Sequence, residues 1–258
     1  MAATLNIALI QSFLHWEDPS KNRDMFEEKI NVISDDVDLI VLPEMFTTGF
    51  TMTPQNLDSS EGQKTVHWMQ DLAVKKNTAL VGSVVIQEDE LFYNRLFFVY
   101  PDGTFTTYDK KHTFTLAGED KVYQAGTERL TLEYKGFRIC PLICYDLRFP
   151  VWARNTSDYD VLIYVANWPK KRINAWDTLL KARAIENMAY CIGVNRTGED
   201  ALGYEYPGHS AVYDVLGETL AYSKKEEVLY ATLEKEHLTT IRRKLRFLED
   251  RDDFSLKE

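Results

Sequence analysis

The chain has 258 residues, of which 45% are hydrophobic and 27% are charged, and its formal net charge is -10. This composition is typical of a globular protein, and the length is ample for a core that needs no disulfide or metal support. The negative charge argues against nucleic acid or an anionic membrane surface as a partner. No run approaches the roughly 18 apolar residues of a membrane helix. No basic segment precedes the first apolar run, so we expect no signal peptide.

Strand-like and helix-like segments alternate through the first half of the chain. Residues 5–11 form the first predicted strand, after which Asp18 and Pro19 provide the cap and first turn of a helix. A buried strand is predicted over 38–42, and a helix over 64–76. Three more strands are predicted at 79–87, 91–100 and 104–108, the last two joined by a Pro-Asp-Gly turn.

The second half continues this alternation after a loop over 110–126. Lys135 and Gly136 form a predicted tight hairpin turn, and a helix is expected to start near Phe149. The remaining predicted strands are 130–134, 137–143, 160–166, 191–195, 210–215, 218–222 and 228–233, and the remaining helices are 173–189 and 235–248. Long helices between strands indicate an α/β protein with mixed sheets. No flexible linker interrupts the chain, so residues 1–258 are predicted to form one domain.

Three cysteines occur, at positions 140, 144 and 191. On an extended strand Cys140 and Cys144 would lie about 13 Å apart, which is too far for a disulfide. An odd cysteine count without a secretion signal suits a reducing cytoplasm, where we expect this protein to reside.

Several common kinds of site are missing from the sequence. The five histidines are far apart and no C-x-x-C occurs, so we expect no metal. Neither a G-x-x-x-x-G-K-[ST] nor a G-x-G-x-x-G motif is present, and the G-x-S-x-G elbow of serine hydrolases is also absent. These absences leave room for an enzyme that depends on a thiol.

Three reactive side chains each follow a predicted strand, where a sheet edge opens into a cleft. They are Glu44, Lys110 and Cys144. A cysteine with an ordinary pKa of about 8.5 needs a base at neutral pH, and Glu44 can supply one. Lys110 can stabilise an oxyanion, and the Tyr145 backbone N–H follows the nucleophile directly.

Taken singly, each of these residues has a simpler interpretation. A cysteine at a strand end is usually an inert core residue, and a lone Glu or Lys there is usually a solvated edge residue. Asp146 and Arg148 are expected to form a structural ion pair, and His112 to be a hydrogen-bonded support. Cys191 and His209 are interpreted as structural.

Together the three stretches resemble the nitrilase superfamily of carbon–nitrogen hydrolases. The resemblance rests on Leu42-Pro43-Glu44, on the Tyr-Asp-Lys-Lys-His box that contains Lys110, and on Cys-Tyr-Asp-Leu-Arg-Phe-Pro, which starts at Cys144. It covers nearly the whole chain. Lys110, not Lys111, matches the family position.

Within the superfamily the chain resembles the bacterial ω-amidases, on Pro141–Trp152, on Tyr-Val-Ala-Asn-Trp-Pro at 164–169 and on Ala-Arg-Ala-Ile-Glu-Asn at 182–187. The family has a second glutamate near the cleft, for which Glu119 is preferred over Glu128. Glu119 would orient Lys110 or the leaving group, although a plain loop carboxylate stays an equal alternative. Asn167 and Trp168 follow another predicted strand and are expected to line the pocket.

The resemblance implies an α-β-β-α sandwich that forms a homodimer. It implies hydrolysis of a linear amide through a Cys144 thioester, without metal or organic cofactor. The expected substrates are small dicarboxylate monoamides such as 2-oxoglutaramate or succinamate. Lys170, Lys171 and Arg172 could contact the substrate carboxylate, but a solvated basic turn is the preferred interpretation.

Other functions stay open at this point. The same three residues could serve a nitrilase or a hydrolase of N-carbamoyl compounds. A binding module that kept the fold without catalysis, or a redox sensor based on Cys144, are the remaining alternatives. The intact Glu–Lys–Cys set argues against a silent protein.

Overall fold

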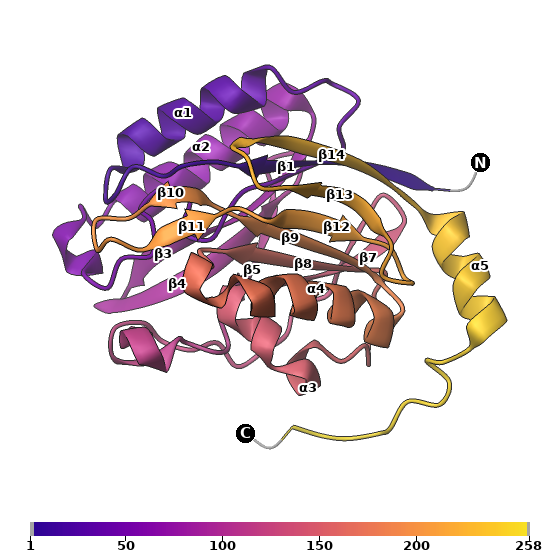
Figure 1. Cartoon of the computed structure of the whole chain (residues 1–258). Coiled ribbons are helices and arrows are strands. Elements are labelled where there is room, and N and C mark those ends of the chain that lie inside the picture. Colours follow the sequence, from indigo (N-terminus) through magenta and orange to yellow (C-terminus); the bar gives the residue numbers. More distant parts are fainter. Residues whose placement is uncertain (1–2, 257–258) are drawn as a thin grey trace.

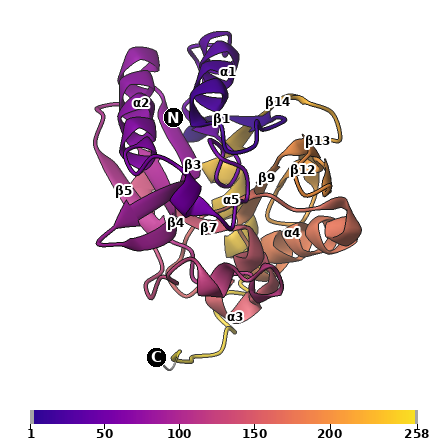
Figure 2. The same cartoon turned by 90° about the vertical axis from the view of Figure 1, so that its left-hand side faces the viewer.

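Two six-stranded sheets stack face to face, with helices on their outer sides (Figure 1). The computed structural model describes residues 3–256. In the turned view, α1 and α2 lie on one side of the strands and α3 and α4 on the other (Figure 2). The expected α/β class and α-β-β-α sandwich are therefore confirmed.

The first sheet has the order β14-β1-β2-β3-β4-β5. Its strands are β1 (Thr4–Gln11), β2 (Leu39–Val41), β3 (Ala79–Glu88), β4 (Leu91–Val99), β5 (Phe105–Asp109) and β14 (Glu227–Glu234). The three strands β1, β2 and β3 are parallel, while β14, β4 and β5 pair antiparallel. The parallel strands are connected through α1 (Pro19–Asn31) and α2 (Glu61–Lys76).

The second sheet has the order β13-β12-β9-β8-β7-β6. Its strands are β6 (Leu132–Tyr134), β7 (Phe137–Ile143), β8 (Val161–Ala166), β9 (Tyr190–Asn195), β12 (Ser210–Tyr213) and β13 (Thr219–Ser223). The strands β7, β8 and β9 are parallel, connected through α3 (Pro150–Ala153) and α4 (Ile173–Asn187). A final helix, α5 (Lys235–Leu245), follows β14.

The side chains of β1 point alternately to its two faces, so this strand contributes to two apolar layers. Ile7 and Leu9 belong to the cluster between the two sheets, while Ala8 and Ile10 belong to the cluster under α1 and α2. Successive side chains of a strand point to opposite faces. A strand covered on both faces therefore reads as a continuous apolar run, which is the pattern of residues 5–11.

Most predicted elements are present, with shifts at their ends. The predicted hairpin turn is confirmed, since Lys135 and Gly136 have φ values of 46° and 80° between the paired strands β6 and β7. The first difference is α2, which begins at Glu61 and not at Lys64. The second is a small hairpin, β10 (Thr197–Glu199) and β11 (Glu205–Pro207), which was not predicted.

Cys140, Cys144 and Cys191 are all free and buried, in agreement with the spacing argument that kept the first two apart. Over residues 3–256, no helix combines the length and the apolar character needed to cross a membrane.

The packing of α4 on the second sheet depends on Gly193 in β9. A Cβ at this position would lie 2.3 Å from Leu180 Cδ1 and 2.8 Å from Trp176 Cζ2.

We expect Gly193→Ala to lower the free energy of unfolding by about 1–3 kcal/mol through overpacking, measured by urea denaturation. Adding Leu180→Ala should cost less than the sum of the two single substitutions, because the double variant removes the clash with Leu180. Strict additivity would argue against this contact.

Candidate active site

The three predicted residues meet between the two sheets. Glu44 follows β2 and Lys110 follows β5, both in the first sheet, whereas Cys144 follows β7 in the second. Glu44 and Lys110 are 0% and 1% exposed, and Cys144 is 9% exposed. Stacking of the sheets therefore brings a carboxylate, an ammonium and a thiol to one place.

A buried ion cluster joins Lys110 to two glutamates. The Lys110 Nζ atom lies 2.8 Å from Glu44 Oε1, and 3.0 and 2.9 Å from the two carboxylate oxygens of Glu119. Asn94 Nδ2 donates to both carboxylates, at 2.8 Å to Glu44 and 3.2 Å to Glu119. Buried charges of this kind persist where each one has a partner.

The structure shows which of two glutamates and which of two lysines lie in this cluster. Glu119 is 0% exposed and bonded to Lys110, whereas Glu128 is exposed. Lys111 Nζ lies 5.4 Å from the centre of the Trp152 ring and so is directed elsewhere. Glu119, not Glu128, therefore belongs to this cluster, and Lys110, not Lys111, is the lysine that it contacts.

Charge pairing and burial act in opposite directions on these groups. Burial would lower the pKa of the Lys110 ammonium, but Glu119 and Glu44 more than offset this and raise it. Burial is the largest influence on Glu119 and raises the pKa of its carboxyl, although Lys110 acts against the rise. At neutral pH the lysine is therefore cationic and can hold both carboxylates.

Cys144 starts a tight 3₁₀ turn, η4 (Cys144–Arg148), and has the unusual φ of +43°. Asp146, fully buried, holds this turn by accepting hydrogen bonds from the Ile143 N–H at 3.0 Å and the Tyr108 hydroxyl at 2.8 Å. It also accepts from the His112 N–H at 3.0 Å. A left-handed non-glycine residue costs about 1–3 kcal/mol and persists only where its surroundings fix it.

The predicted ion pair between Asp146 and Arg148 is wrong. The Asp146 carboxylate is already taken by backbone N–H groups and by Tyr108. Arg148 leaves the turn on another side, with its Cζ atom 5.1 Å from the centre of the Trp168 ring. His112 does have the supporting position that was expected, because its Nδ1 lies 2.8 Å from Asp146 and its ring stacks on Phe149.

Asn167, just after β8, connects the cysteine to the ion cluster. Its carbonyl oxygen lies 3.9 Å from Cys144 Sγ. Its N–H donates to Glu44 Oε2 at 2.9 Å, and its Nδ2 donates to the Glu44 carbonyl at 2.6 Å. Burial raises the pKa of the Cys144 thiol well above its ordinary value, Glu44 adds to the rise and Lys110 opposes it. The resting thiol is therefore neutral at pH 7.

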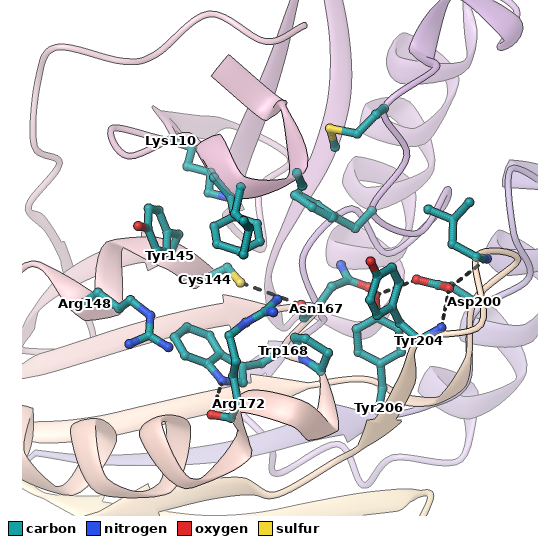
Figure 3. Close-up of a pocket in the computed structure, with 17 residues that line it drawn as sticks. Lys110, Cys144, Tyr145, Arg148, Asn167, Trp168, Arg172, Asp200, Tyr204 and Tyr206 are labelled. Atoms are coloured by element: carbon teal, nitrogen blue, oxygen red, sulfur yellow. Dashed lines mark hydrogen bonds between the residues drawn. The ribbon is translucent and has the colours of Figure 1, made fainter. Parts of the chain in front are cut away.

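Cys144 opens into a cavity of about 320 Å³ (Figure 3). Its wall includes the predicted pocket residues Tyr145, Asn167 and Trp168. Other lining residues were not predicted for this pocket, and they are Phe50, Met52, Phe114, Leu116, Ala117, Arg148, Pro169, Asp200, Leu202, Tyr204 and Tyr206. This volume is in the usual range for a small-molecule site.

The basic turn after Trp168 divides into two parts. Lys170 and Lys171 are exposed, as a solvated turn requires, with Lys170 Nζ 2.5 Å from Glu205. Arg172 differs, because it lines the pocket with its Cζ atom 4.8 Å from the centre of the Phe114 ring. The solvated interpretation is therefore wrong for Arg172.

Sequence reasoning also missed Asn94, the amide that bridges both glutamates. The signal was present, since Asn94 and Arg95 interrupt the apolar run of β4. A buried polar residue in such a run needs a partner. Within residues 3–256, no group of three or more His, Cys, Asp or Glu side chains is arranged to hold a metal ion.

The neutral thiol predicts an unusual pH dependence of alkylation. Only the thiolate is nucleophilic, so we expect the rate of Cys144 alkylation by iodoacetamide to rise about tenfold per pH unit to about pH 9. A free cysteine under the same conditions levels off near its pKa of about 8.5. Intact mass and peptide mapping follow the reaction. A plateau at or below neutral pH would contradict the raised pKa.

Comparisons with known proteins show the family to which the chain belongs. The family model described as carbon-nitrogen hydrolase matches residues 6–243. The chain is 43% identical to omega-amidase YafV of Yersinia enterocolitica, over 98% of this chain and 99% of that protein. It is 33% identical to 2-oxoglutaramate amidase of Bacillus subtilis, over 95% and 96% of the two chains. The crystal structure of XC1258 from Xanthomonas campestris, a CN-hydrolase superfamily protein with an arsenic adduct in its active site, superposes with a TM-score of 0.95 at 39% identity, over 98% and 99% of the chains. The chain therefore belongs to the carbon–nitrogen hydrolase family.

Proposed function

We propose that this protein is an ω-amidase, which hydrolyses the terminal amide of dicarboxylate monoamides such as succinamate and 2-oxoglutaramate. The observation that carries the substrate class is a pair of arginines, Arg148 and Arg172, in the same pocket as Cys144. Among the residues that the structure describes, neither guanidinium has a carboxylate within 4.0 Å. Arginine binds carboxylates well, so the substrate itself is expected to bring the anion.

The similarity to omega-amidase YafV and 2-oxoglutaramate amidase supports the same assignment. A substrate of this class has an amide at one end and a carboxylate at the other. The amide would lie at Cys144 and the carboxylate at the arginines. Figure 3 draws Arg148 and Arg172 near Cys144 in one pocket.

Acylation begins with the neutral thiol of Cys144. Glu44 takes its proton as the sulfur attacks the amide carbon, because the raised pKa leaves little thiolate beforehand. The Lys110 ammonium and the Tyr145 backbone N–H stabilise the oxyanion of the tetrahedral intermediate. Glu44 then returns the proton to the nitrogen, the C–N bond breaks, and ammonia leaves a thioester on Cys144.

Deacylation repeats these steps with water. Glu44 takes a proton from the water as its oxygen attacks the thioester carbon, and the C–S bond breaks to release the dicarboxylate. The proton returns to the Cys144 sulfur, so the complete cycle consumes only the amide and one water molecule.

Glu119 is proposed as the residue that positions Lys110. Both of its oxygens lie within 3.0 Å of Lys110 Nζ, and the Phe114 N–H donates to Glu119 Oε2 at 2.5 Å. These bonds hold the ammonium in place while Glu44 exchanges its proton.

The residues of the pocket favour some of the alternative functions over others. A simple nitrile has no anionic group and would leave both arginines without a partner. An N-carbamoyl amino acid does carry a carboxylate, so the arginine pair keeps it as the second candidate. A redox sensor needs an accessible thiol of low pKa, and burial raises the pKa of Cys144. The homodimer, the single domain over 1–258 and the cytoplasmic location stay predictions.

Substrate class is tested by ammonia release from succinamate, 2-oxoglutaramate, a nitrile and an N-carbamoyl amino acid. We expect turnover of the two ω-amides, and a loss of roughly 10³-fold or more in Cys144→Ala. Turnover of the nitrile alone would refute the ω-amidase assignment. Full activity of Cys144→Ala would refute the nucleophile.

Carboxylate recognition is tested with Arg172→Met. We expect it to lower kcat/KM for succinamate by roughly 10- to 100-fold, from the loss of a charged hydrogen bond worth about 1.5–3 kcal/mol. Butyramide, which has a methyl group in place of the carboxylate, should be affected little. Lys171→Met removes the same charge from an exposed neighbour and is the matched control. Equal losses on both amides would mean that Arg172 does not bind the carboxylate.

A further inference from the structure

The hairpin β10–β11 forms a wall of the pocket that neither the fold nor the reaction explains. Asp200, Tyr204 and Tyr206 of this hairpin line the cavity. In Figure 3 they lie on one side of Cys144, and Tyr145 and Arg148 lie on the other. The hairpin thus faces the reacting group across the space that a substrate would fill.

Behind this wall lies a buried cation. Arg196 is 0% exposed, and its Cζ atom lies 4.5 Å from the centre of the Tyr206 ring. Its Nε donates to the Thr197 carbonyl at 3.1 Å and its Nη2 to the Glu199 carbonyl at 3.1 Å, so it holds both ends of β10. No carboxylate lies within 4.0 Å of Arg196 among residues 3–256. Burying an unpaired guanidinium is costly, which indicates a specific use.

The side chains of Tyr206 and Asp200 link Arg196 to the tip of the hairpin. The Tyr206 hydroxyl donates to Asp200 Oδ2 at 2.7 Å. Asp200 Oδ1 accepts from the backbone N–H groups of Leu202 at 2.9 Å and Tyr204 at 3.0 Å. A cation under the ring and an anion on the hydroxyl therefore fix Tyr206 from both ends.

Two glycines fix the base of the hairpin against the body of the protein. Gly198 has a φ of +84°, and a Cβ there would lie 2.8 Å from the Phe13 ring. Gly208 has a φ of +75°, and a Cβ there would lie 2.5 Å from the Gln11 side chain. The base is thus in close contact with the first sheet and the loop after β1.

The tip, in contrast, presents apolar side chains to the mouth of the pocket. Leu202 and Tyr204 line the pocket but are 66% and 42% exposed. Leu116, also a lining residue, is 77% exposed. Apolar side chains at a pocket mouth would meet the part of a substrate that extends beyond the space between Cys144 and the arginines.

We propose that the β10–β11 hairpin determines how long an amide the pocket accepts, and that Arg196 is the positioning residue that holds the hairpin in place. The identity of the substrates rests on the proposed function. The role of the hairpin does not, because it concerns access to Cys144.

The selectivity test compares kcat/KM for succinamate with that for adipamate, which is two methylene groups longer. Leu202→Ala should shift the ratio toward adipamate by about tenfold, the usual effect of a methylene-sized change in a pocket. Tyr206→Phe keeps the ring on Arg196 but breaks the bond to Asp200, and should shift the ratio in the same direction. Arg196→Lys should keep more of the selectivity than Arg196→Met, since it keeps a cation under the ring.

A second readout needs no turnover. The ratio of alkylation rates of Cys144 by iodoacetamide and by the bulkier N-phenyl iodoacetamide reports the width of the mouth, and Cys140 and Cys191 are 0% exposed and should not compete. Leu202→Ala and Tyr206→Phe should favour the bulkier reagent several-fold. Glu205→Gln is the matched control, because its ion pair with Lys170 is on the exposed side of the same hairpin.

The turnover and alkylation measurements distinguish failure of the proposed function from failure of the hairpin proposal. If no ω-amide is hydrolysed, the proposed function fails while the alkylation ratio still tests the hairpin. If Leu202→Ala and Tyr206→Phe leave the alkylation ratio at the wild-type value, the hairpin proposal is overturned. A shift in Glu205→Gln equal to that in Tyr206→Phe would also overturn it, because the effect would then not be specific to the Tyr206–Asp200 bond.

Discussion

The buried contact between Lys110 and the two glutamates is the interaction on which the rest of the site depends. Both carboxylates have oxygens within 3.0 Å of the Lys110 nitrogen, and all three side chains are at most 1% exposed. Removing Lys110 would leave two buried carboxylates without a cation, at a cost of several kcal/mol. The cluster also connects the two sheets, because Asn167, which follows β8 of the second sheet, donates to Glu44, which follows β2 of the first. Electrostatics and sheet packing therefore support each other here.

The backbone is strained at the group that would react. Cys144 has a left-handed φ, and the buried carboxylate of Asp146 holds the turn that begins there. This arrangement places the thiol at the end of β7, where burial and the nearby Glu44 carboxylate disfavour its ionised form. The raised pKa of the thiol then makes the carboxylate of Glu44 necessary, because a protonated nucleophile needs a base at the moment of attack.

The pattern of strands and helices in the sequence allowed the α/β class and the three strand-end residues to be predicted, whereas the sandwich was predicted from the family resemblance. Continuous apolar runs such as 5–11 mark strands covered on both faces, and the residues directly after such strands gather at one edge of the sheet.

The sequence did not allow the contacts of individual side chains to be predicted. Asp146 and Arg148 are two residues apart, but whether they meet depends on the direction of each side chain in a 3₁₀ turn. Arg172 in a run of basic residues looks the same as its exposed neighbours. The β10–β11 hairpin is too short and too polar to show a strand pattern, and the burial of Arg196 is a consequence of tertiary packing alone.

The central claim is that Cys144 becomes acylated while ammonia leaves. Acid-quenched mass spectrometry of the protein during turnover of succinamate tests it most directly, with Cys144→Ala as the control. The account predicts a mass increase of one succinyl group, located on the peptide that contains Cys144, appearing together with the first ammonia and absent from the control. Ammonia release by the wild-type protein with no acyl group on Cys144 at any quench time, under conditions where a thioester standard survives, would contradict it.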